Sequence, residues 1–481
     1  MKKLIFLFLL LKFDFNSEAQ GTFQKTFGGG SAYSVEKTND GNLIITGDPM
    51  FLLKMDPNGN VLWHKSYSSI SGAVIGSSVV QTTDGGFIIA GTLNLGSPTS
   101  KVVLVKTDSN GNPLWSKTYG GNKSESANGV INTLDGGYAI IGTTKSFGTN
   151  FDDIYVIKTD SNGNLQWSRD IADSPTDFID YGNSIVQNSD GSYAICVRIG
   201  NPVTNSNDIG VMKFSQNGVM QWVKCYGGTG DDGGNYITTT SDGGYAVAGY
   251  TESFGAGNKD IYVLKTDNAG NLNWSKVLGG VNSDAGNFID EMSDGTYFLT
   301  GSAYLSGNRW IVNLKFDPNG NNLANNFFGG TNGQDGYDLV KIGSGFITVG
   351  VTTSFGPDEI YIIKADSLGN SGCYESSQII TVTSPATVVT SPSIQVSTPL
   401  TVVNTISFTT SNVSTVNTLC SLVSVPEVHD DPFVMDGAKL VHIYDVLGRQ
   451  VNQVYFDNVY ICQYIDDKGN SFFRKEIKVQ P

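Results

Sequence analysis

Short apolar strands alternate with glycine-rich turns along most of the chain, in a pattern that repeats about every 52 residues. One half of the repeat reads "DGGY" followed by an apolar run, as in "DGGFIIAGT" at 84 and "DGGYAIIGT" at 135. The other half is a hairpin with a turn written "DSNGN", "DNAGN" or "DPNGN", whose glycine supplies the positive φ that tight hairpins need. Two hairpins per repeat predict four strands.

The ends of this array predict a closed ring. Seven copies of each half-unit can be counted, but the last turn, at 366–370, is not followed by the tryptophan-bearing strand of the other copies. The stretch "GTFQKTFGG", residues 21–29, has the character of that missing strand and precedes the first "DGG" half-unit. We therefore expect an all-β protein in which residues 21–373 form a seven-bladed β-propeller closed by the N-terminal strand.

Five tryptophans occupy one register of the repeat, four residues after the turn glycine: Trp63, Trp115, Trp167, Trp222 and Trp274. A fixed position inside a strand predicts a structural role in packing between blades. Stacking against carbohydrate is the alternative.

Composition narrows the class of partner. The formal charge of −15 excludes a chain that is basic throughout and argues against nucleic acid as a partner. Residues 1–19 place Lys2 and Lys3 before an apolar run and a small-residue site, which predicts a secretory signal peptide. No later stretch is long and apolar enough for a transmembrane segment, so we expect none in the mature chain.

Residues 374–425 are rich in serine, threonine and proline, and Pro385, Pro392 and Pro399 recur every seven residues. This composition predicts an extended spacer. Cys373 and Cys420 bracket it and are the candidate pair for a disulfide, which would tie a small strand pair.

Residues 426–481 alternate again and predict a small C-terminal β-sandwich. They resemble the C-terminal sorting domain (type A) of proteins exported by the type IX secretion system of Bacteroidota, although Asp457 and Asn458 stand where that family usually has a glycine. The matching residues are Tyr444, Leu447, Gly448, Arg449, Tyr460 and Gly469. The resemblance implies the type IX secretion machinery as a partner, and a protein that is secreted or held at the outer-membrane surface.

Candidate chemistry is sparse. The three histidines allow no catalytic triad or histidine metal cluster within the ring. Both kinds of turn should lie on one face of the ring, so we place any ligand on the opposite face, where the loops vary. Several of those loops carry an acid before the innermost strand: Glu125, Asp180, Asp232, Asp284 and Asp335. Either each side chain accepts hydrogen bonds from its own loop, or together they form a ring of carboxylates that binds calcium.

The "KxDxxGxxxW" pattern of residues 21–373 is similar to the tryptophan-bearing repeats of secreted bacterial propellers, including the quinoprotein-like family. That family has a Thr-Gly turn, eight blades and an adjacent-cysteine disulfide, which this sequence lacks, so the resemblance implies the fold without the cofactor. We expect a non-catalytic module that binds an extracellular protein or glycan. The alternatives are a carboxylate-dependent glycan hydrolase or lyase, a quinoprotein-like oxidoreductase, and a purely structural surface protein.

Overall fold

A computed structural model describes most of the chain as β-strands. The described residues are 21–148, 151–173, 179–305, 307–372, 375–376, 381–390, 394–397, 402–405, 407–412, 416–422, 439–444, 458–465 and 471–478. These ranges contain no helix, and therefore none that could cross a membrane. By their contacts they divide into a unit of Thr22–Ser421 and a second unit that holds the C-terminal strands.

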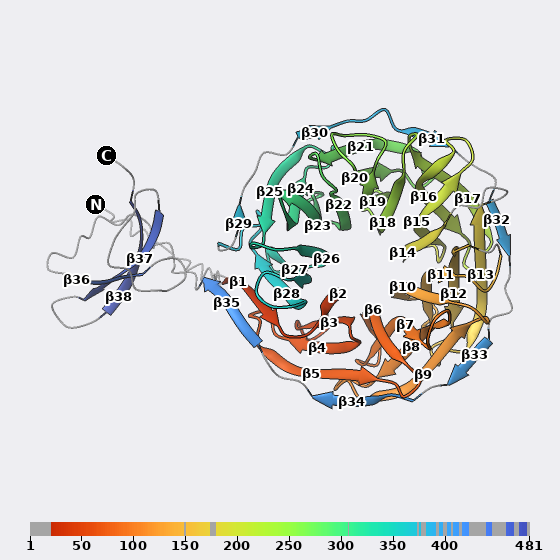
Figure 1. Ribbon diagram of the computed structural model, residues 1–481, viewed down its shortest axis with the longest axis horizontal. Helices are drawn as coiled ribbons and strands as arrows, with labels where there is room; N and C mark the ends of the chain where they lie inside the picture. The colour runs from red at the N-terminus through yellow and green to blue at the C-terminus, as the bar shows by residue number, and fades with distance from the viewer. Residues whose placement is uncertain are drawn as a thin grey trace, which may run out of the picture. The chain divides into compact units, whose positions relative to one another are not determined.

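Seven sheets arranged in a ring make up the larger unit (Figure 1). Blades 1 to 3 contain β2 (Ser31–Lys37), β3 (Leu43–Asp48), β4 (Phe51–Met55) and β5 (Val61–Ser68); β6 (Ala73–Gln81), β7 (Phe87–Asn94), β8 (Ser100–Thr107) and β9 (Pro113–Gly120); and β10 (Glu125–Asn132), β11 (Tyr138–Thr144), β12 (Asp153–Thr159) and β13 (Leu165–Asp173). Blades 4 and 5 contain β14 (Tyr181–Gln187), β15 (Tyr193–Asn201), β16 (Ser206–Phe214) and β17 (Met220–Gly227); and β18 (Asp232–Thr239), β19 (Tyr245–Thr251), β20 (Asp260–Thr266) and β21 (Leu272–Gly279). Blade 6 contains β22 (Ala285–Glu291), β23 (Tyr297–Leu305), β24 (Asn308–Phe316) and β25 (Asn322–Phe328), and blade 7 contains β26 (Gln334–Ile342), β27 (Gly345–Thr352), β28 (Glu359–Ala365) and β1 (Thr22–Phe27).

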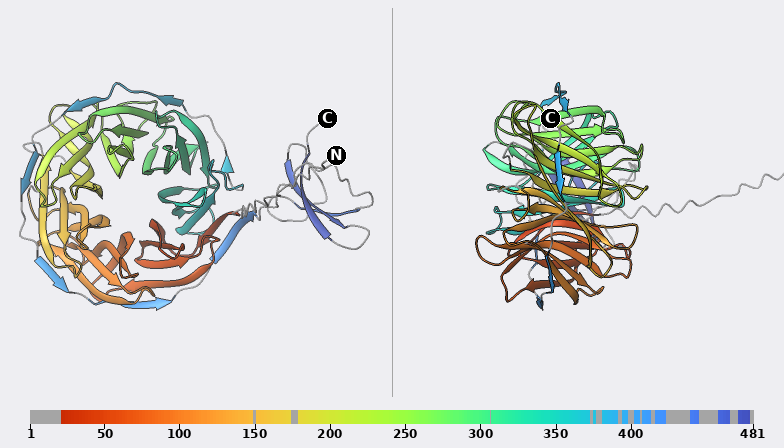
Figure 2. Two further views of the ribbon diagram at one scale, coloured as in Figure 1. Left: turned by 180° about the vertical axis from the view of Figure 1, so that it is seen from behind. Right: turned by 90° about the vertical axis from the view of Figure 1, so that its right-hand side faces the viewer.

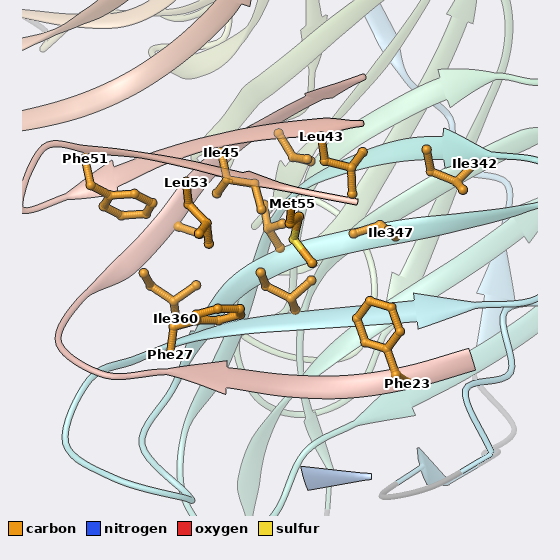
Figure 3. Packing of buried hydrophobic residues seen from close by; sticks show 14 residues of the cluster. Phe23, Phe27, Leu43, Ile45, Phe51, Leu53, Met55, Ile342, Ile347 and Ile360 are labelled. Carbon is orange, nitrogen blue, oxygen red and sulfur yellow. The ribbon is translucent and has the colours of Figure 1, made fainter. Parts of the chain in front are cut away.

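The N-terminal strand closes the ring, as predicted. β1 pairs antiparallel with β28, with Phe23 opposite Lys364 and Thr26 opposite Tyr361. Phe23 and Phe27 are buried in one cluster with residues of blades 1 and 7, among them Leu53 and Ile347 (Figure 3). The first strand of the chain thus completes its last blade and packs against its first.

A belt of seven short strands surrounds the ring, and this differs from the expected spacer. The belt strands are β29 (Glu375–Ser376), β30 (Thr381–Thr383), β31 (Val388–Thr390), β32 (Ile394–Ser397), β33 (Val402–Thr405), β34 (Thr409–Asn412) and β35 (Val416–Leu422). They add a fifth strand to blades 6, 5, 4, 3, 2, 1 and 7 in that order, so the belt runs against the direction of the blades (Figures 1 and 2). The expectation of an extended chain was right, but the expectation of a separate spacer was wrong.

Sheet edges explain why the belt docks. The outermost strand of each blade would otherwise present unpaired N–H and C=O groups to solvent. Each belt strand pairs with one of them, for example in the antiparallel pairs Val277 opposite Thr383 and Ile171 opposite Val396. Successive belt strands begin six to eight residues apart, so one seven-residue proline period corresponds to one blade.

The tryptophans pack each blade against the next. Each indole lies over the turn glycine of the following blade, where an added Cβ would come within 2.7–2.9 Å of ring atoms. Each also contacts an aromatic ring of that blade at 5.8–6.3 Å between centroids: Phe87, Tyr138, Tyr193, Tyr245 and Tyr297. In the same register blade 6 has Ala324 and blade 7 has Phe23.

The "DGG" aspartates hold a lysine of the third strand in their own blade. Asp84 pairs with Lys106 at 2.9 Å, Asp135 with Lys158 at 2.9 Å and Asp242 with Lys265 at 2.8 Å. The lysine side chains are almost completely buried, so each pair ties one hairpin of the blade to the other.

The second unit is described by one antiparallel sheet of β36 (Lys439–Tyr444), β37 (Asn458–Ile465) and β38 (Ser471–Lys478). Tyr444 ends β36 and lies opposite Ile461, and Tyr460 lies in β37. Leu447, Gly448, Arg449 and Gly469 are outside the described residues. The predicted sandwich and sorting signal stay predictions.

Cysteine chemistry is clear at two positions. Cys196 and Cys225 are buried free thiols within blade 4. Burial raises the pKa of both thiols, so they are unreactive core residues. Cys373 is outside the described residues, so its pairing with Cys420 stays a prediction.

Candidate functional site

The two faces of the ring differ as the sequence predicts. Because the four blade strands are antiparallel, the "DGG" and "DSNGN" turns share one face, and the loops after the second and fourth strands share the other. The uniform turns are hairpin turns: Asp108 Oδ1, for example, accepts hydrogen bonds from the backbone N–H of Asn110 and Asn112. We call the opposite side the loop face.

Four of the five predicted acids occupy equivalent positions on the loop face. In each of these four blades the acid lies two residues before the residue of the first strand that pairs with the fifth residue of the second strand. The four acids are Glu125, Asp180, Asp232 and Asp284, and all are buried. Asp232 accepts hydrogen bonds from the N–H of Gly228 at 2.8 Å and the hydroxyl of Ser253 at 2.7 Å. Asp180 accepts one from the N–H of Gly200 at 2.9 Å. Asp180 and Asp232 thus accept hydrogen bonds from the loops around them, whereas Glu125 is ion-paired with Lys101 of the preceding blade.

Asp335 does not belong to this set. In blade 7 the equivalent position is filled by Gln334, and Asp335 is the next residue along β26. Because side chains of a strand alternate between faces, this one-residue offset turns Asp335 away from the position of the other four.

The predicted acids are not gathered at one point. They lie at successive seams between blades, and each of the four equivalent acids neighbours a residue of the preceding blade or of its own loop. Among the residues that the structure describes, no three His, Cys, Asp or Glu side chains converge as a metal site would require. The hypothesis of a calcium-binding ring stays a prediction.

Asp335 instead lines a pocket on the loop face between blades 6 and 7. Its volume is about 580 Å³, and its lining comes from the end of β23, the start of β24 and the loops at 329–333 and 353–358. The residues that give it its chemistry are Tyr304, Arg309, Asn332, Asp335, Thr353 and Asp358.

An ion pair between Arg309 and Asp335 forms part of the lining of this pocket. Arg309 Nη2 lies 2.8 Å from Asp335 Oδ1, and the hydroxyl of Ser302 also donates to that carboxylate. The pair holds both side chains in one geometry and keeps Asp335 an acceptor. Tyr304, which is 40% exposed, stands beside it and presents an aromatic surface.

Two further features adjoin the pocket. Tyr33 and Tyr337, from the innermost strands of blades 1 and 7, meet edge to face at 5.0 Å between centroids. Burial, together with the charge of Asp335, raises the pKa of Tyr337, so it is a neutral phenol. Asp358 has φ +44°, in the left-handed region, and its carbonyl accepts a hydrogen bond from Gly30 N–H at 2.6 Å. A non-glycine residue held there is a strained backbone of the kind that gathers at functional sites.

The sequence pointed to Asp335 but missed the rest of the pocket. Tyr304 and Arg309 lie at the adjoining ends of β23 and β24, and Asp358 lies about 50 residues further along the chain. The three residues share no sequence motif. One signal was available: blade 6 departs from the repeat at "YLSGNRW", where blades 3, 5 and 7 carry longer loops that share the run "SFG".

Comparisons with known proteins find only distant likenesses. No protein-family model matches the chain, and a search of curated proteins finds no match. Among solved structures, the chain is similar to puromycin hydrolase (11% identity, TM-score 0.46, 92% of this chain and 60% of that chain). It is also similar to Drosophila Plexin A, solved with Semaphorin 1b (9%, TM-score 0.39, 72% and 87%). A third is a Bacteroides caccae protein of unknown function (10%, TM-score 0.34, 63% and 93%).

The topology itself defines the class. Seven radial antiparallel sheets with an N-terminal closing strand make this protein a seven-bladed β-propeller. At the identities and TM-scores above, none of the three likenesses carries an argument about function.

Proposed function

We propose that the propeller is a non-catalytic binding module that takes up a glycan in the pocket between blades 6 and 7. The observation that carries the proposal is the combination, in one open pocket, of an exposed tyrosine ring with an ion-paired arginine and aspartate.

Sugar chemistry matches this combination. A sugar ring has an apolar C–H face, which packs on an aromatic ring, and hydroxyls that need both donors and acceptors. Arg309 supplies fixed donors and Asp335 a fixed acceptor, and Asn332 and Thr353 can serve as either. Apart from Tyr304 and Val351, the residues that line the pocket are polar, charged or glycine, which favours a polar ligand over a hydrophobic peptide.

Hydrolysis of the bound glycan is the second candidate, because two carboxylates, Asp335 and Asp358, line the pocket. A glycosidase needs one of its acids protonated as the general acid. The Asp335 carboxylate is already engaged by Arg309 at 2.8 Å and by the hydroxyl of Ser302. The geometry therefore supports binding better than catalysis. Incubating the protein with its glycan and analysing the products by mass spectrometry separates the two: cleavage that Asp358→Asn abolishes would establish the enzyme.

Binding is tested with a glycan array followed by calorimetry on the full-length protein. Tyr304→Ala is expected to weaken the affinity for the best glycan about tenfold, since one stacking contact contributes about 1–1.5 kcal/mol. Tyr181→Ala is the matched control, because Tyr181 lies on the same face and is 37% exposed but is not part of the pocket. Equal losses in both variants, or a ligand that proves to be a protein, would contradict the proposal.

We also propose that the protein is exported and displayed through its C-terminal segment. The similarity of residues 426–481 to type IX sorting domains supports this route, and the C-terminal strands belong to a different unit from the ring. Deleting residues 437–481 is expected to leave the protein in the periplasm, as cell fractionation would show. Normal appearance of the deleted form outside the cell would rule this route out.

A further inference from the structure

At three of the seams between neighbouring blades, two residues from equivalent positions of the repeat face each other. The first residue comes from the start of the third strand of one blade, and the second is the buried acid before or at the start of the next blade. The pairs Lys101 and Glu125, Asp208 and Asp232, and Asp260 and Asp284 fill this position between blades 2 and 3, 4 and 5, and 5 and 6. Members of each pair are 24 residues apart in the chain.

Between blades 2 and 3 this position already holds a cation. The Lys101 ammonium lies 2.8 Å from Glu125 Oε2 and also 2.8 Å from the carbonyl oxygen of Lys123. The Glu125 side chain is completely buried, so the ammonium neutralises a carboxylate that water does not reach. The repeat thus places a positive charge between two blades at this point.

Between blades 5 and 6 an acid stands where Lys101 would be. Asp260 is opposite Thr251, as Lys101 is opposite Leu93, and it is 1% exposed. Asp284, which is 2% exposed, is the partner acid. Both carboxylates converge on Gly279: a Cβ added there would lie 1.9 Å from Asp260 Oδ1 and 2.7 Å from Asp284 Oδ2. The absence of a Cβ at Gly279 lets both carboxylates approach the backbone, and each other, closely.

Asp260 Oδ1 lies against Gly279, beside the Asp284 carboxylate, without a hydrogen-bond donor in the described part of the chain. Asp260 Oδ2 accepts a hydrogen bond from Ala256 N–H, and Asp284 accepts from the N–H groups of Gly280 and Tyr304. No donor among the described residues, which include both loops of this seam, reaches Asp260 Oδ1. Burial raises the pKa of Asp260, and burial together with the charge of Asp260 raises that of Asp284, against the opposing effect of the Arg309 charge.

The seam between blades 4 and 5 shows how the chain satisfies the same pair with its own groups. Asp208 and Asp232 converge on Gly227, and a Cβ there would lie 2.4 Å from an oxygen of each. Here the Asn201 amide donates to Asp208, and the Ser253 hydroxyl donates to Asp232 at 2.7 Å. Among the described residues, no such side-chain donor reaches Asp260 Oδ1.

We propose that Asp260 and Asp284 bind a calcium ion at the seam between blades 5 and 6. Calcium prefers carboxylate and carbonyl oxygens in flexible loops, and the remaining ligands would be backbone carbonyls and water. The ion takes the place that the Lys101 ammonium has between blades 2 and 3 and links the two blades. This inference does not rest on the proposed glycan pocket, although Asp284 adjoins that pocket through the backbone of Tyr304.

The test is thermal unfolding and calorimetric titration of the full-length protein after dialysis against a chelator. At about 5 mM calcium, several times the dissociation constants of about 0.1–1 mM typical of extracellular calcium modules, the unfolding midpoint should rise by a few degrees. Asp260→Asn should remove this rise. Asp208→Asn, at the equivalent residue of the preceding seam, should keep it. Asp260→Lys, which copies Lys101, should be insensitive to calcium and at least as stable in chelator as the parent protein.

Two results would overturn the site. An absence of any calcium effect on the parent protein would mean that the two carboxylates share a proton instead. An equal calcium effect in the parent and in Asp260→Asn would place the binding at other acids of this strongly negative chain. Because each readout is calcium-dependent stability, loss or survival of glycan binding neither supports nor contradicts the calcium site.

Discussion

Replacing Thr26 with proline is expected to lower the free energy of unfolding by at least about 3 kcal/mol. Thr26 is fully buried in β1, which lies between β28 and β35, so an amide of this strand faces a neighbouring strand whichever way it points. Proline removes that donor inside a sheet, where it is not tolerated. The closing strand belongs to the sheet of blade 7 and continues directly into blade 1, so its loss opens the propeller. Urea denaturation measures the change.

Thr22→Pro is the matched control for this variant. Thr22 is the first residue of the same strand and precedes the register pairs with β28, a position at which proline is accepted. Its expected cost is about 1 kcal/mol or less. Similar losses in the two variants would mean that β1 does not hold the ring shut.

Truncation after Gly372 is expected to make the protein aggregate and to make it readily cleaved by protease. The truncation removes the belt and leaves seven outer strands with unpaired edges, which are templates for pairing between molecules. The direct loss of stability should be smaller, a few degrees in the unfolding midpoint. Each backbone hydrogen bond contributes about 0.5–1.5 kcal/mol, and ordering each belt residue costs about 1–2 kcal/mol.

The control is truncation after Leu422, which removes the second unit and keeps the belt. Light scattering and limited proteolysis compare the two forms. The longer form should behave as the parent protein does. Aggregation of both forms alike would attribute the protection to the C-terminal unit rather than to the belt.

The ring could be predicted from the sequence because its rules are local and repeated. Turn glycines, the "DGG" aspartates and the tryptophan register each mark a strand, and the stretch at 21–29 supplied the missing one. The belt could not be predicted in the same way. Its strands have two to seven residues and pair mainly through the backbone, so no apolar alternation marks them. The seven-residue proline period matches the number of belt residues that span one blade, but the sequence alone led us to expect a spacer.

The candidate sites were predicted only in part. The sequence alone placed Asp335 in one set with the other loop acids. The pairing of β26 with β27 shows that Gln334 holds the equivalent position in blade 7. The acids at 232 and 284 were found, but their partners Asp208 and Asp260 were missed because they belong to the preceding blade. The constant spacing of 24 residues was a signal in the sequence that could have revealed these pairs. Arg309 and Tyr304 carry no such signal, since only the packing of two blades brings them beside Asp335.

Hydrogen exchange on the intact protein tests the central claim, closure of the ring by the first strand, most directly. Because β1 lies between two strands, its amides in Thr22–Phe27 should exchange as slowly as those of β11, Tyr138–Thr144, which lies inside blade 3. Exchange of the Thr22–Phe27 amides within seconds, at the rate of an unpaired segment, would contradict the closed ring.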